Sequence, residues 1–73
     1  MRTYKLYISG FGDIPNAASY IDGNTMVSFI FYPGNSDYEN FKTEINNQTA
    51  QLEDIDGNLM TPEQAIAYVA TLP

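Results

Sequence analysis

The sequence predicts an α+β domain in which a small, mostly antiparallel sheet of three or four strands carries two short helices on one face. Three observations lead to this prediction: apolar and polar residues alternate near the start, an Asp-Gly pair separates two apolar runs, and two helix-start motifs occur in the second half. At 73 residues the chain has room for a single domain over residues 1–73. The expected order of elements is strand, strand, strand, helix, strand, helix.

The first strand is predicted at residues 3–9, where Tyr4, Leu6 and Ile8 alternate with more polar side chains. Two glycines and a proline then interrupt the pattern, which predicts a loop. A second strand is predicted at residues 17–21. It precedes Asp22-Gly23, a pair that favours a type I′ hairpin turn.

The third strand is predicted at residues 25–32, the most strand-like run of the chain, and it is apolar on both faces. One face carries Val27, Phe29 and Phe31, and the other carries Met26, Ile30 and Tyr32. Apolar residues on both faces predict either a central strand that is covered on both sides or a strand with one face in an interface.

A proline and a glycine end the third strand, and the pair Ser36 and Glu39 predicts a capping box at the start of a helix. Tyr38, Phe41 and Ile45 then recur with helical spacing, so this helix is expected to have one apolar stripe. The abrupt change of character between these two segments therefore predicts a strand-to-helix corner.

The last part of the chain predicts a short strand at residues 49–54, a turn at an Asp-Gly pair, and a second helix. Thr61 is the expected N-cap of this helix, with Pro62 at its first position and Gln64 completing a capping box. Its apolar stripe is expected to contain Ile66, Val69 and Leu72.

The formal net charge is −6, because nine carboxylates face only three basic residues, Arg2, Lys5 and Lys42. This balance disfavours nucleic acids and anionic membranes as ligands, because both are bound mainly through Lys and Arg. Carboxylates that are dispersed along a chain usually serve to keep the protein soluble. The alternative is a surface that imitates nucleic acid or engages a basic partner.

Histidine and cysteine are both absent. Their absence removes Ser–His–Asp relays, cysteine nucleophiles and conventional zinc sites, so we expect no enzyme activity, no cofactor and no metal. Glu53, Asp54 and Asp56 are the remaining candidates for holding a hard cation or for acid–base work. A calcium loop starting at Asp54 fails, however, because Leu59 and Ala65 stand where a glycine and a glutamate are needed.

Aromatic residues are the strongest positive signal for binding. Phe11, Tyr20, Tyr32 and Tyr38 all lie in or beside predicted loops, and we take them as candidate contacts to a protein partner. The alternative is that such residues replace aliphatic side chains in a small core.

Residues 32–41 resemble a Pro-x-Asn-x-Asp-Tyr-x-x-Phe pattern found in small bacteriophage and prophage accessory proteins. The matching positions are Pro33, Asn35, Asp37, Tyr38 and Phe41. The resemblance implies a viral origin, and it transfers no functional residue to this chain.

We therefore expect a non-enzymatic protein-interaction or assembly module, as in a small bacteriophage accessory or structural protein. Its partner would be another protein or further copies of itself, and its setting the cytoplasm, that of the host if viral, or the virion. The alternative function is an acidic phage inhibitor or nucleic-acid mimic that binds a host protein. A metal enzyme that uses carboxylates alone is the third hypothesis.

Overall fold

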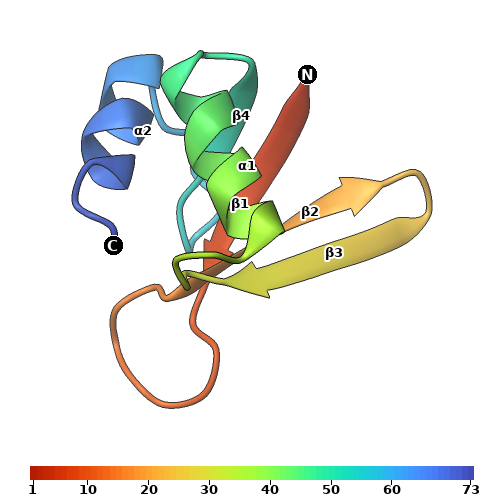
Figure 1. Cartoon of the computed structure of the whole chain (residues 1–73), viewed down its shortest axis with the longest axis vertical. Coiled ribbons are helices and arrows are strands. Elements are labelled where there is room, and N and C mark those ends of the chain that lie inside the picture. Colours follow the sequence, from red (N-terminus) through yellow and green to blue (C-terminus); the bar gives the residue numbers. More distant parts are fainter.

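The computed structural model describes residues 1–73 and contains one four-stranded sheet and two α-helices (Figure 1). The elements are β1 (Arg2–Tyr7), β2 (Ala17–Asp22), β3 (Thr25–Ile30), α1 (Ser36–Asn46), β4 (Ala50–Glu53) and α2 (Pro62–Val69). The strand order is β3-β2-β1-β4, with two antiparallel pairs and one parallel pair between β1 and β4. The predicted α+β class, the mostly antiparallel sheet and the order of elements are confirmed.

The two helices pack against the same face of the sheet, and the β2–β3 hairpin extends beyond them (Figure 1). The core between the two layers contains Tyr4, Leu6, Ala18, Phe29, Tyr38, Phe41, Ile45, Ala50, Leu52, Ala65 and Val69. All three members of the predicted stripe of α1 are in this set. The stripe of α2 is rotated from the predicted one, because Ala65 and Val69 are buried while Ile66 and Leu72 are only partly buried.

The prediction of a central strand covered on both sides is wrong, because β3 lies at the edge of the sheet. The parallel strand β4 joins the other side of β1, so β1 and β2 occupy the centre. The ladder extends one hydrogen bond past β3, where the amide of Phe31 donates to the carbonyl of Asn16 (2.9 Å). The strand ends there because the amide of Tyr32 donates to the carbonyl of Ile30 (2.9 Å) and turns the chain.

The hairpin between β2 and β3 also differs from the predicted type I′ turn. Asp22 pairs with Thr25, so Gly23 and Asn24 are the two central residues. Gly23 has a positive φ of 63°, whereas Asn24 does not have a positive φ. A glycine with positive φ at the first central position is typical of a type II′ turn.

The start of α1 corrects the predicted capping box. Asn35 is the N-cap, and its Oδ1 accepts a hydrogen bond from the amide of Tyr38 (3.1 Å). Ser36 is already the first residue of the helix. At the start of α2 the prediction is confirmed, because Thr61 and Gln64 exchange side-chain to backbone hydrogen bonds of 3.1 and 2.9 Å.

Four aromatic rings form the centre of the core. The ring of Phe41 stacks on that of Phe31 (centroids 5.7 Å apart) and meets Tyr4 edge-on (4.9 Å). The ring of Phe29 lies 5.6 Å from Phe41 and 5.9 Å from Tyr4. Each such pair contributes about 0.5–1.5 kcal/mol beyond simple burial, so these rings join the sheet firmly to α1.

Tyr4 also connects the core to the surface charges. Its hydroxyl donates to the carboxylate of Glu44 (3.0 Å) and accepts from the guanidinium of Arg2 (3.3 Å). Burial raises the pKa of Tyr4 to about 12. The folded protein therefore holds this proton more tightly than the unfolded chain, in which tyrosine titrates near pH 10.

We expect the Tyr4→Phe substitution to lower the free energy of unfolding by about 1 kcal/mol at neutral pH, because a buried hydrogen bond to a carboxylate is lost. The stabilisation that comes with the raised pKa is fully present below pH 10 and is lost as the pH rises toward 12. Melting temperatures measured from pH 7 to pH 12 should therefore show the gap between wild type and Tyr4→Phe closing above pH 10. A gap that stays constant over this range contradicts the assignment.

Removing the hydroxyl of Tyr68 is expected to have the opposite effect on stability from removing that of Tyr4. Its hydroxyl is buried with no protein group within hydrogen-bonding distance, and burial raises its pKa. Tyr68→Phe removes a hydroxyl that gains nothing from the folded state, so we expect the free energy of unfolding to stay unchanged or rise by up to about 1 kcal/mol. Urea denaturation tests this, and a loss above about 1 kcal/mol would reveal a hydrogen bond to this hydroxyl.

Candidate functional site

Neither helix covers the sheet face opposite the core (Figure 1). Three of its side chains are large, apolar and exposed: Ile21 (62%), Met26 (64%) and Ile30 (49%). Ile21 and Met26 are cross-strand partners, and Ile30 follows on β3 beyond Ser28. We call Ile21, Met26 and Ile30 the open-face patch.

A polar row crosses the middle of the same face. Cross-strand pairing aligns Glu53, Lys5, Ser19 and Ser28 from β4 to β3. A shallow hollow of about 310 Å³ lies on this face between β4 and the patch, with Lys5, Glu53 and Met26 in its lining. The face thus offers one opposite-charge pair over β1 and β4 and uncharged side chains over β2 and β3.

The outer edge of β3 is the second feature of this surface. No strand pairs with it, and its six residues include no charged residue, proline or glycine. Residues 23–36 as a whole contain no charged side chain. Natural edge strands are usually protected by lysine, proline, a bulge or a covering segment. β3 contains neither lysine nor proline, and its register with β2 has no bulge.

The opposite edge of the sheet is protected. The amide of Met60 donates to the carbonyl of Leu52 (2.8 Å), and Glu53 forms an antiparallel bridge with Leu59. The chain after β4 therefore covers part of that edge, which leaves β3 as the open one.

The loop between β1 and β2 presents a further exposed aromatic residue. Its ends are joined by Asn16, whose side chain accepts from the amide of Ser9 (2.7 Å) and donates to its carbonyl (3.0 Å). At the tip, Phe11 is fully exposed between two glycines of positive φ, and Ile14 is 73% exposed. The loop leaves the sheet at the end where β2 begins and β3 finishes (Figure 1).

The structure does not gather the four predicted contact residues on one surface. Phe11 and Tyr32 are exposed at the same end of the sheet. Tyr20 is half-buried on the helix side, with the guanidinium of Arg2 4.0 Å from its ring centroid.

Tyr38 must be removed from the contact candidates. Its ring is fully buried in the core, and its hydroxyl donates to the carbonyl of Pro73. Its place after a turn suggested exposure, but it also belongs to the helical stripe, and the stripe determined where it lies.

Sequence reasoning missed the open-face patch as a set of contact residues. The signal was present in the doubly apolar pattern of residues 25–32, for which an interface was the alternative explanation. Loops and aromatic residues were favoured as contact candidates instead. Met26 and Ile30 were therefore named only as one face of a strand, and Ile21 received no role.

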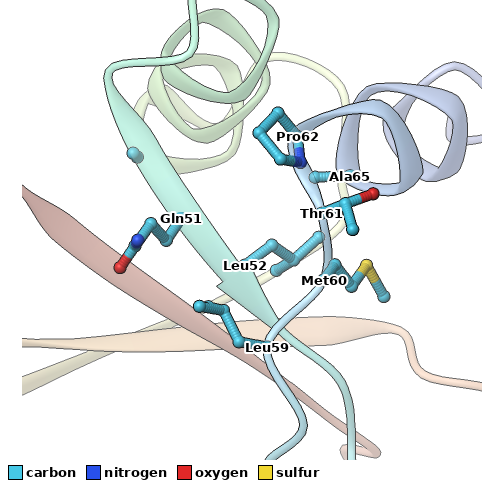
Figure 2. Close-up of a pocket in the computed structure, with 8 residues that line it drawn as sticks. Gln51, Leu52, Leu59, Met60, Thr61, Pro62 and Ala65 are labelled. Atoms are coloured by element: carbon cyan, nitrogen blue, oxygen red, sulfur yellow. The ribbon is translucent and has the colours of Figure 1, made fainter.

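A second hollow of about 290 Å³ lies between β4 and the start of α2 (Figure 2). Leu52, Leu59, Met60 and Ala65 supply most of its apolar lining, while the side chain of Gln51 extends to the other side of β4 (Figure 2). The hydroxyl of Thr61, which also lines the hollow, accepts the capping hydrogen bond of α2 from the amide of Gln64. No Asp, Glu, Lys, Arg or Tyr side chain lines the hollow.

The carboxylate of Asp54 stabilises the turn after β4. Oδ1 of Asp54 accepts hydrogen bonds from the amides of Asp56 and Asn58, both 2.9 Å long. The backbone hydrogen bond from Asn58 is the main reason that the pKa of Asp54 is lowered. No group of three His, Cys, Asp or Glu side chains is placed where it could hold a metal ion.

The fold and these surfaces define a small α+β domain with a mixed four-stranded sheet, one open edge and an uncovered face. Neither helix is long and apolar enough to cross a membrane. Searches against models of protein families, curated proteins and solved structures find no match to this chain.

Proposed function

We propose that this chain is a non-enzymatic protein-interaction or assembly module whose contact surface is the edge of β3 together with the open-face patch. The observation that carries the proposal is the unprotected edge of β3, six residues without charge, proline or glycine. An edge of this kind readily accepts a further strand, because its backbone donors and acceptors have no partners within the sheet.

The open-face patch supports the same surface. Single exposed apolar residues are common and need no explanation. Ile21 and Met26, however, are adjacent across the hairpin, and Met26 and Ile30 lie on the strand with the free edge. An added strand would place its side chains beside Met26 and Ile30, so it would pair the free edge and partly cover these two patch residues in one event.

A photo-reactive amino acid at position 26 tests this proposal in the cell that makes the chain. We expect discrete cross-linked adducts from position 26. We expect none from position 67, an exposed residue of α2 on the far layer. Equal adducts from the two positions, or none from position 26, would overturn the proposal.

The non-enzymatic part of the proposal rests on the missing histidine and cysteine and on the turn that occupies Asp54. A carboxylate-dependent metal enzyme would be stabilised by its metal, because a ligand that binds only the folded state raises the melting temperature. We expect calcium, magnesium and manganese to leave the melting temperature unchanged. A clear rise with one of them would favour the metal enzyme instead.

The bacteriophage assignment rests on the resemblance of residues 32–41. Three of the matching residues have structural roles in this fold, since Asn35 caps α1 and Tyr38 and Phe41 lie in the core. These roles explain the matching residues by local structure, so the resemblance alone supports our proposal of a small phage accessory or structural protein, in the host cytoplasm or the virion.

An acidic inhibitor or nucleic-acid mimic would need its carboxylates together on one face. The nine carboxylates are spread over the loop after β1, the end of β2, both ends of α1, the end of β4, the turn that follows it and the first turn of α2. Salt separates the two functions, because binding to a basic protein weakens with ionic strength whereas pairing along an uncharged edge does not.

A further inference from the structure

We propose that β3 pairs antiparallel with β3 of a second copy of this chain, about a two-fold axis at Ser28, so that the two sheets form one continuous sheet. This inference rests on the proposed function and names the partner for the same surface. The argument has three steps: the free backbone groups, the register that uses them, and the charges around the edge.

The first step identifies the free backbone groups. The amide of Phe31 donates toward β2, to the carbonyl of Asn16. Because hydrogen bonding alternates along an antiparallel strand, the amides of Met26, Ser28 and Ile30 point away from β2. All three residues are exposed, and their side chains lie on the open face of the sheet.

The second step is the register. A two-fold axis at Ser28 places Ser28 opposite its own copy and Met26 opposite Ile30 of the second copy. Met26 and Ser28 offer an outward amide and an outward carbonyl, and Ile30 offers its outward amide. The carbonyl of Ile30 already accepts from the amide of Tyr32, so it would accept the new hydrogen bond on its second lone pair. The pairing is self-complementary, as a symmetric dimer requires. The small Ser28 lies at the axis, and a Met26–Ile30 apolar pair lies on each side of it, a favourable cross-strand combination.

The third step is charge. Each copy carries a net charge of −6, so two copies repel at long range. The segment between Asp22 and Asp37 is uncharged, however, so no charged side chain lies on the pairing strand itself. An acidic or basic peptide would find no opposite charge on this edge, whereas a second copy supplies an equally neutral strand.

These features predict a weak, salt-strengthened dimer. One six-residue strand per copy gives an interface at the small end of the known range, which favours micromolar over nanomolar affinity. Added salt screens the repulsion between the two acidic bodies. Sedimentation should show a dimer fraction that rises with protein concentration and with salt. A monomer at millimolar concentration in high salt would overturn the inference.

The absence of cysteine makes the register directly testable. In the proposed dimer two Ser28→Cys residues face each other about 5.5 Å apart, within the range of a disulfide. We expect the oxidised dimer of Ser28→Cys to form about tenfold faster than that of Thr71→Cys, an exposed control position, because pairing raises the effective concentration of the thiols. Equal rates at the two positions would overturn the inference.

Three further variants test the alignment in detail. Met26→Cys and Ile30→Cys should each cross-link poorly alone and efficiently when mixed, because residue 26 faces residue 30 and not its own copy. Ser28→Lys should abolish the dimer by placing like charges opposite each other at the axis, while Thr71→Lys should leave it intact. Efficient cross-linking of Met26→Cys alone would show a shifted register and contradict the axis at Ser28.

Failure here can be separated from failure of the proposed function. If Ser28→Cys does not cross-link while the photo-reactive residue at position 26 captures a different protein, the self-pairing is overturned and the interaction surface stands. If position 26 yields no adduct at all, both proposals fail.

Discussion

Replacing Phe41 with alanine is expected to lower the free energy of unfolding by about 3–5 kcal/mol, the usual cost of removing a fully buried phenylalanine. The ring of Phe41 is fully buried and contacts those of Tyr4, Phe29 and Phe31. Stabilities of about 0.05–0.15 kcal/mol per residue imply roughly 4–11 kcal/mol for a chain of this length. The substitution therefore removes a large share of the total, which urea denaturation measures directly.

Two controls sharpen this expectation. Phe41→Leu keeps much of the buried volume, so it should cost clearly less than the alanine variant. Phe11→Ala removes the same side chain from the fully exposed loop tip and should change the free energy of unfolding by less than about 0.5 kcal/mol. Similar losses at positions 41 and 11 would mean that the aromatic cluster is not the centre of the core.

The local elements were predictable because their determinants are close in sequence. The apolar spacing of Tyr38, Phe41 and Ile45 defines one face of a helix, and the structure buries all three. The capping box of α2 was equally predictable from the sequence. The start of α1 was not, because Asn35 and Ser36 are both good N-cap residues. The choice between them depends on how the chain leaves β3.

The strand order was not predictable, because it depends on contacts between distant segments. A run that is apolar on both faces is typical of a central strand, but the two helices of this chain cover only one face of the sheet. Placing β4 beside β1 left β3 at the edge. The same placement exposes Met26 and Ile30, so the error about strand order and the omission of the open-face patch have a single cause.

The predicted contact residues show a related limit. Tyr32 and Tyr38 flank the same turn, yet Tyr32 is 65% exposed and Tyr38 is fully buried. Proximity to a turn raises the chance of exposure, whereas membership of a helical stripe lowers it. Where both apply, as at Tyr38, the packing of the helix on the sheet decides.

The second large effect is expected at Leu52, the residue that joins β4 to α2. Its side chain is fully buried and lines the hollow beside Ala65 and Met60 (Figure 2). Leu52→Ala should lower the free energy of unfolding by about 2–5 kcal/mol, because it removes buried methyl groups next to an existing hollow. Gln51→Ala, one residue earlier and on the exposed side of β4, should change it by less than about 0.5 kcal/mol.

The denaturant dependence of Leu52→Ala tests whether the whole chain unfolds as one unit. β4 meets the rest of the sheet only through its parallel pairing with β1, and α2 packs against β4 and α1. If these elements belong to the same cooperative unit as the aromatic core, the midpoint should fall while the slope of the transition stays constant. A reduced slope, with helix signal lost before the aromatic signal, would instead mean that β4 and α2 unfold first and that Leu52 holds only them in place.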